Sequence, residues 1–248
     1  TTGSINWVPL PTQIDNYNFE IEVTDGIAST LLKYNIYVNA PPVISSRPPT
    51  IFILPKGGKL NFPLKSFDLN SSTKLDWKLL SGPTKMTLSQ QGDLQWSGNE
   101  LGHHHYEIQL SDGIDSVQWK ASIYVNTPPV ITSIPIKAIP TGEQYFYPLF
   151  ARDENTISPF DSLAVNEIIY SLVQGPEGMN IDENNTLIWE TKDNPPGEYM
   201  VTITASDGAE DAMQVFPVFI KKSVYLKKIN NPRLKTNALI NKYFFFVF

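Results

Sequence analysis

The chain has 248 residues, of which 41% are hydrophobic, 12% aromatic and 18% charged, and its formal net charge is −6. This composition excludes a disordered chain, and the absence of cysteine excludes a disulfide framework and any thiolate metal or nucleophile site. Residues 1–220 contain twelve basic and twenty-five acidic residues, a net charge of −13, which argues against a nucleic-acid partner.

Residues 1–40, the first unit, are predicted to be the carboxyl-terminal half of a truncated β-sandwich repeat. Downstream of Trp7, apolar and polar residues alternate from Tyr17 to Asp25-Gly26, and the apolar positions are Tyr17, Phe19, Ile21 and Val23. A period of two is typical of a half-buried strand, and Asp-Gly is typical of the tight turn that follows one. A returning strand then leads to Asn39.

The same landmarks recur twice, and they predict complete repeats at residues 41–127 (the second unit) and 128–222 (the third unit). Trp96 follows Trp7 after 89 residues, and Trp189 follows Trp96 after 93. Each tryptophan again precedes an alternating strand that ends in Asp-Gly. Because short strands alternate with glycine- and proline-rich turns, we predict an all-β fold class of tandem Greek-key β-sandwich domains in a row.

Two proline pairs and a basic tail complete the organisation. Pro41-Pro42 and Pro128-Pro129 hold the chain extended, so they are predicted to be junctions between units. Residues 223–248 match no repeat, and we expect a disordered tail there. Its apolar end, Tyr243–Phe248, is far shorter than the ~20 residues needed to cross a bilayer, so no transmembrane segment is expected in this fragment.

Repeated motifs carry a resemblance to a known family. The second and third units share a Gly-Pro-x-x-Met motif at 82–86 and 175–179, a Leu-x-Trp motif at 94–96 and 187–189, and Ser-Asp-Gly at 111–113 and 206–208. The chain thus resembles the dystroglycan-type cadherin-like and immunoglobulin-like tandem repeats of large bacterial surface proteins. The resemblance implies a cadherin- or immunoglobulin-like fold, an extracellular or cell-surface location and bacterial origin.

The resemblance also implies calcium at the junctions, because cadherin-type repeats bind calcium there through clustered oxygen ligands. The matching residues form one set per junction: Asn39, Asp68, Asn70 and Asp112, then Asn126, Asp153, Asn155 and Asp207. Carboxylates that cadherins place at the domain start and in the linker are missing, so the expected affinity is weak, of millimolar order. In the alternative interpretation, Asp25, Asp112 and Asp207 shape their turns through side-chain hydrogen bonds to the backbone.

No catalytic site is predicted. The three histidines, His103, His104 and His105, lie in one run, and no carboxylate pair stands outside the turn positions. His104 falls on the inward side of its strand, and the outward His103 and His105 lack a third metal ligand, so structural roles are expected for all three.

The tryptophans are predicted to be core residues rather than a sugar-binding platform. Trp7, Trp96 and Trp189 recur at one position of the repeat, and Trp119 is in phase with apolar neighbours. We therefore expect a non-enzymatic structural or adhesive segment, acting as a spacer or as a weak multivalent contact module. Its partners would be a protein or glycan at a cell surface, or neighbouring repeats. The alternatives are a calcium-dependent module that recognises glycan or protein, and an accessory module of an extracellular hydrolase.

Overall fold

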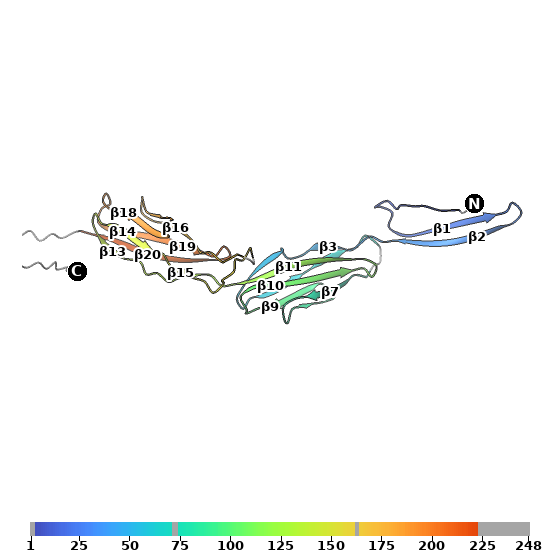
Figure 1. Ribbon diagram of the computed structural model, residues 1–248, viewed down its shortest axis with the longest axis horizontal. Helices are drawn as coiled ribbons and strands as arrows, with labels where there is room; N and C mark the ends of the chain where they lie inside the picture. The colour runs from blue at the N-terminus through green and yellow to red at the C-terminus, as the bar shows by residue number, and fades with distance from the viewer. Residues whose placement is uncertain (1–2, 71–73, 162–163, 223–248) are drawn as a thin grey trace, which may run out of the picture.

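The computed structural model describes residues 3–70, 74–161 and 164–222, and all the helix or strand elements in these ranges are β-strands. The strands form successive bodies along an elongated molecule, from β1–β2 at one end to β13–β20 at the other (Figure 1). No helix in the described ranges is long and apolar enough to cross a bilayer. The predicted all-β fold class is confirmed, whereas the prediction of a disordered tail concerns residues outside the described ranges.

The second unit is a sandwich with its own buried core. Its strands are β3 (Val43–Ser46), β4 (Ile51–Pro55), β5 (Lys59–Pro63), β6 (Lys65–Phe67), β7 (Asp76–Ser81), β8 (Thr87–Leu88), β9 (Asp93–Ser97), β10 (Gly102–Ser111) and β11 (Ser116–Asn126). One sheet has the order β4-β11-β10-β7, a second has the order β5-β9-β8, and β3 pairs with β6. Strand β4 runs parallel to β11, and the other pairings are antiparallel.

The third unit repeats this topology. Its strands are β12 (Val130–Ile131), β13 (Ala138–Pro140), β14 (Gln144–Pro148), β15 (Ala151–Arg152), β16 (Ile169–Gln174), β17 (Asn180–Ile181), β18 (Thr186–Glu190), β19 (Gly197–Ser206) and β20 (Asp211–Lys221). The sheets have the orders β13-β20-β19-β16 and β14-β18-β17, and β12 pairs with β15. A separate core lies between these sheets, so each of the two units buries its own apolar residues.

Alternation along the strands explains these cores. In β10, Tyr106, Ile108 and Leu110 are buried, while Glu107 and Gln109 are more exposed. The predicted tryptophans anchor both cores in the same way, because Trp96 and Trp189 are buried and each indole Nε1 donates to a backbone carbonyl at 3.1 Å. A period of two therefore places one face of each long strand in the core.

The first unit consists of a hairpin, β1 (Asp15–Thr24) and β2 (Ser29–Val38), and the described residues include no second sheet packed against it. The prediction that Trp7 is a core residue is wrong, since its side chain is 39% exposed and contacts Tyr17 edge-on at 5.0 Å. Without an opposing sheet, the ring has no interior in which to be buried. Trp119 is only partly buried at the edge of its core, where the Arg47 guanidinium lies 3.7 Å from the ring centre.

Candidate functional site

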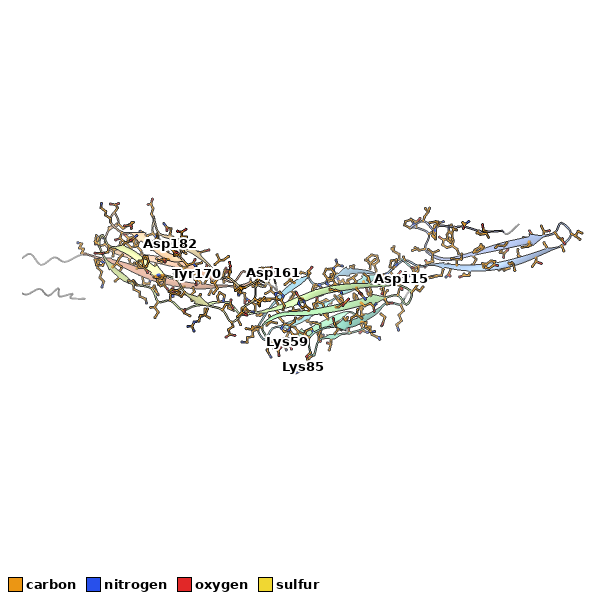
Figure 2. The ribbon with its side chains drawn as sticks, in the orientation of Figure 1. Lys59, Lys85, Asp115, Asp161, Tyr170 and Asp182 are labelled. Carbon is orange, nitrogen blue, oxygen red and sulfur yellow. The ribbon has the colours of Figure 1, made fainter. Side chains whose placement is uncertain are left out.

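At the first junction, the linker asparagine of the first unit contacts two carboxylates of the second unit. Asn39 follows β2, and its amide Nδ2 donates to Asp112 Oδ2 at 2.8 Å and to Asp115 Oδ2 at 2.9 Å. Asn39 Oδ1 is buried and has no hydrogen-bond partner among the described residues. Figure 2 shows Asp115 at the end of the second unit that faces the hairpin.

The second junction repeats this arrangement in a more buried form. Asn126, the last residue of β11, donates through Nδ2 to Asp207 Oδ2 at 2.9 Å and to Glu210 Oε2 at 3.1 Å. Asn126 is 1% exposed and Asp207 is 4% exposed. Asn126 Oδ1 is again buried without a partner in the described part of the chain. Both amide hydrogens of this asparagine are used, and its oxygen is left over.

A second asparagine clamps the linker backbone at each junction. Asn70 Oδ1 accepts from the N–H of Ala40 at 2.7 Å, and its Nδ2 donates to the carbonyl of Val38 at 2.9 Å. Asn155 makes the same two contacts one unit later, at 3.0 and 2.9 Å, with the residues that flank Asn126. These bonds hold the extended linker against the loop of the following unit.

The aspartate two residues before each clamping asparagine completes the cluster. Asp68 Oδ1 accepts from the N–H of Asn70 at 2.8 Å, and its Oδ2 is buried without a partner among the described residues. Asp153 Oδ1 accepts from the N–H of Asn155 at 2.7 Å, and its Oδ2 accepts from Asn166 Nδ2 at 3.2 Å. All eight residues predicted by resemblance therefore lie at the two junctions, four at each.

The junction carboxyl groups have shifted pKa values with different causes. Burial raises the pKa of Asp153, and the adjacent Asp207 carboxylate raises it further, while the bonds from Asn155 and Asn166 oppose the shift. At the first junction, burial works against the charged form of Asp112. Hydrogen bonds from Asn39 and from backbone N–H groups nevertheless hold the pKa of Asp112 below its usual value.

The turn-shaping interpretation is confirmed by hydrogen bonds. Oδ1 of Asp25 accepts two backbone N–H bonds at 2.9 and 2.8 Å, Oδ1 of Asp112 accepts two at 2.7 and 2.6 Å, and Oδ1 of Asp207 accepts two at 2.8 and 2.7 Å. Only Oδ1 is used for the turn. The remaining oxygen of Asp112 and Asp207 faces the linker asparagine, so turn formation and a junction role coexist in one side chain.

Three acidic contributors were missed from the sequence. Asp115 and Glu210 stand three residues after Asp112 and Asp207, where the first unit has Ala28. The sequence did contain a signal for these two residues, because both units that follow a junction have an acidic residue three positions after the aspartate of the Asp-Gly turn. The third is Asp15, whose Oδ1 accepts from Nδ2 of the clamping asparagine of the second unit at 3.1 Å. Its position in the first unit gave no repeat signal.

The donor set at the junctions suits a hard cation only if amide oxygens take part. No three His, Cys, Asp or Glu side chains converge to hold a metal ion anywhere in the described ranges. The buried oxygens without partners, namely Oδ1 of Asn39, Oδ1 of Asn126 and Oδ2 of Asp68, are of the type that calcium prefers. The residues present thus fit a mixed carboxylate and amide site, and calcium remains a prediction.

The second junction is also closed by the insertion loop of the third unit, which we define as residues 154–161 and 164–166. Glu154 forms an ion pair with Lys56 at 2.8 Å, the carbonyl of Ile157 accepts from Tyr124 at 2.6 Å, and the carbonyl of Ser158 lies 2.9 Å from His103 Nε2. Figure 2 shows Asp161 of this loop against the second unit. The loop therefore ties the two sandwiches together beyond the linker.

The histidine run has structural contacts. His104 packs on Trp96 with ring centres 4.9 Å apart, and its Nε2 lies 2.8 Å from the carbonyl of Glu100. The imidazole of His103 lies 4.8 Å from the ring of Tyr124, beside the insertion loop.

Comparison with known proteins supports the fold and little beyond it. No protein-family profile matches the chain. The dyslexia-associated protein KIAA0319-like protein of Mus musculus is 23% identical over 201 residues, which is 77% of this chain and 19% of that protein. The chain thus spans about a fifth of the length of this relative.

Among solved structures, extracellular domains 3–5 of Drosophila OTK are 12% identical, with a TM-score of 0.51 covering 86% of this chain and 73% of that one. An endo-fucoidan hydrolase of glycoside hydrolase family 107 is 19% identical, with a TM-score of 0.33 covering 87% of this chain and 35% of that one, and so low a score carries no argument. The fold is of the immunoglobulin and cadherin-like type. The dystroglycan-type repeat family stays a prediction.

Proposed function

We propose that this chain is a segment of an extracellular or cell-surface rod, a non-enzymatic spacer whose junctions are stiffened by calcium. The observation that carries the proposal is the second junction, where Asn126 has a buried Oδ1 without a partner in the described residues and donates through Nδ2 to Asp207, whose carboxylate acts on that of Asp153. A buried acceptor without a partner is costly, and two adjacent carboxylates repel each other. One cation bound there relieves both.

The form of the linkers supports a rod. The proline pairs keep the chain extended, and each clamping asparagine fixes the linker backbone to the next unit at two points. The likeness to the extracellular domains of the OTK structure supports a surface location. Repetition of such units gives weak contacts a combined strength, which suits spacing or multivalent adhesion.

Calcium titration by calorimetry, combined with thermal unfolding in calcium and in chelator, tests the proposal. We expect heat of binding and a rise in melting temperature of several degrees at ~10 mM calcium, because a ligand that binds only the folded state stabilises it. Asp207→Asn should abolish both effects at the second junction. Asp25→Asn is the matched control, since Asp25 makes the same turn bonds without a linker asparagine. Neither heat nor a thermal shift at this concentration would contradict the calcium part and leave a spacer.

A further inference from the structure

The chain contains two acceptor motifs for N-linked glycans, and their asparagines lie in opposite surroundings. The acceptor pattern is Asn-x-Ser/Thr, where x is not proline. It occurs at Asn70-Ser-Ser and at Asn184-Asn-Thr, and nowhere else in the sequence. So short a pattern also arises by chance, and the surroundings of each asparagine therefore decide whether a glycan fits there.

Asn70 has no room for a glycan. It is 4% exposed, and its Oδ1 accepts from the N–H of Ala40 at 2.7 Å. Both hydrogens of its Nδ2 are used, one by the carbonyl of Val38 at 2.9 Å and one by Asp15 Oδ1 at 3.1 Å. A glycan on Nδ2 replaces one of these hydrogens and puts a bulky, solvated group at a buried position. A chain glycosylated at Asn70 therefore cannot close the first junction.

Asn184 lies in the turn between β17 and β18, where its side chain is exposed and has no hydrogen-bond partner among the described residues. Asp182 fixes this turn. Its Oδ1 accepts from the N–H groups of Asn184 at 3.0 Å and Thr186 at 2.8 Å, and its carbonyl accepts from the N–H of Asn185 at 3.1 Å. In Figure 2, Asp182 lies well apart from Asp161 of the insertion loop, so a glycan on this turn leaves the second junction untouched.

The burial of Thr186 determines when transfer can occur. This residue completes the acceptor motif, yet it is 5% exposed in the folded protein. Transfer must therefore precede the pairing of β18 with β14 and β17. Before folding, both asparagines are accessible, and folding then retains only those chains whose glycan is compatible with the native structure. Asn184 meets this condition, and Asn70 does not.

We propose that Asn184 is the N-glycosylation site of this chain and that Asn70 is unmodified in the folded protein. In the reaction, Nδ2 of Asn184 forms a bond to the anomeric carbon of an oligosaccharide carried on a polyprenyl pyrophosphate. The bond from that carbon to the pyrophosphate oxygen breaks, the lipid pyrophosphate leaves, and Nδ2 loses one proton. Glycosylation needs the secretory passage that a surface rod implies, but it does not need calcium at the junctions, so the two proposals can fail separately.

Secretion of the full chain from cultured mammalian cells, behind an added signal peptide, tests this site. We expect one glycan per secreted chain, seen as a loss of about 2 kDa on treatment with peptide N-glycosidase F. Asn184→Gln should abolish this loss. Ser72→Ala removes the other motif without changing the Asn70 side chain, and it should leave the loss unchanged. A secreted chain without a glycan, or a glycan that persists in Asn184→Gln, would overturn the proposal.

The second unit supplies a matched control. Its turn between β8 and β9 has Gln91 and Asp93 at the positions of Asn184 and Thr186, counted back from the repeated tryptophans, and Gln91 is exposed. Gln91→Asn/Asp93→Thr places the motif on this equivalent turn and should add a second glycan, which shows that the cells modify turns of this type. Enzymatic deglycosylation in heavy-oxygen water, followed by peptide mass spectrometry, labels each former glycan position. A label on Asn70, or none on Asn184, would contradict the assignment.

Discussion

The two junctions share one hydrogen-bond pattern, and they differ in how far that pattern is removed from water. At the first junction Asn39 is half-buried and one of its two carboxylate partners, Asp115, is exposed. At the second junction Asn126 and its partner Asp207 are both almost fully buried. Water can replace a lost bond at an exposed site, but it cannot do so at a buried one. The same residue types should therefore contribute more stability at the second junction.

The insertion loop accounts for part of this difference. It brings Glu154, Ile157 and Ser158 onto the second unit, where they contact Lys56, Tyr124 and His103. The repeat supplies the junction cluster, and an insertion in one copy of the repeat supplies the extra contact between domains. The second junction should thus be the stiffer of the two.

The largest expected contrast is between Asn126→Ala and Asn39→Ala. Asn126→Ala removes two bonds to carboxylates and leaves buried Asp207 without its linker donor, so we expect a loss of about 2–3 kcal/mol in the free energy of unfolding. Asn39→Ala should cost under about 1 kcal/mol because its partners can turn to water. Urea unfolding in chelator measures both. Equal losses at the two sites would show that burial does not make the second junction the more stabilising one.

Tyr124→Phe tests the contribution of the insertion loop. Burial raises the pKa of Tyr124 to about 12, so its hydroxyl stays protonated and donates to the carbonyl of Ile157. Removing this bond should cost about 1 kcal/mol, and limited proteolysis should then cut the insertion loop faster. The control is Tyr37→Phe, at the same repeat position of the first unit, where the side chain is 38% exposed and no change is expected. A protease-resistant loop in Tyr124→Phe would show that this bond does not close the junction.

The contrast between the junctions also separates what sequence reasoning could reach from what it could not. Asn39, Asn126, Asp112 and Asp207 were predicted through the resemblance to cadherin-type repeats, and neighbouring units of one fold bring them together. The contact of Tyr124 with the insertion loop joins residues 33 apart in sequence across two domains, and no local pattern encodes it. Trp7 was wrongly predicted to be a core residue. Its position in the repeat predicts an inward-facing side chain, but the described residues include no opposing sheet that could bury it.

Asp153→Asn and Asp112→Asn should change stability in opposite directions. The pKa of Asp153 is raised in the folded protein, so ionisation of this carboxyl group lowers stability. The contribution of the protonated group to stability is fully present below the unfolded pKa and is lost as pH rises through the folded pKa. In chelator at pH 7, Asp153→Asn should therefore raise the melting temperature by roughly 2–4 °C, an expectation reduced for the screening of a partly exposed group. The gain should vanish below the unfolded value of 3.8.

Asp112 has a lowered pKa, so its contribution is present above the unfolded value of 3.8 and is lost as pH falls through the folded pKa. Asp112→Asn should lower the melting temperature at pH 7, with a deficit that disappears at lower pH. Thermal unfolding between about pH 3 and 7 follows both variants. If the two variants changed the melting temperature in the same direction at pH 7, the two junctions would not differ in their electrostatics as expected.

Lys56→Ala is expected to have the smallest effect, although its ion pair with Glu154 bridges two domains. The two side chains are 46% and 65% exposed, and exposed ion pairs contribute about 0.2–1 kcal/mol, which salt screens. The backbone N–H of Lys56 donates to the carbonyl of Asn126 at 2.8 Å, and alanine keeps this bond. We expect a loss of about 0.3 kcal/mol that disappears at high salt, similar to that of Lys33→Ala, which breaks an exposed pair in the hairpin. A loss above about 1 kcal/mol that persists in salt would mean that the side chain of Lys56 helps to hold the insertion loop in place, and that the second junction is stiffened by charge as well as by burial.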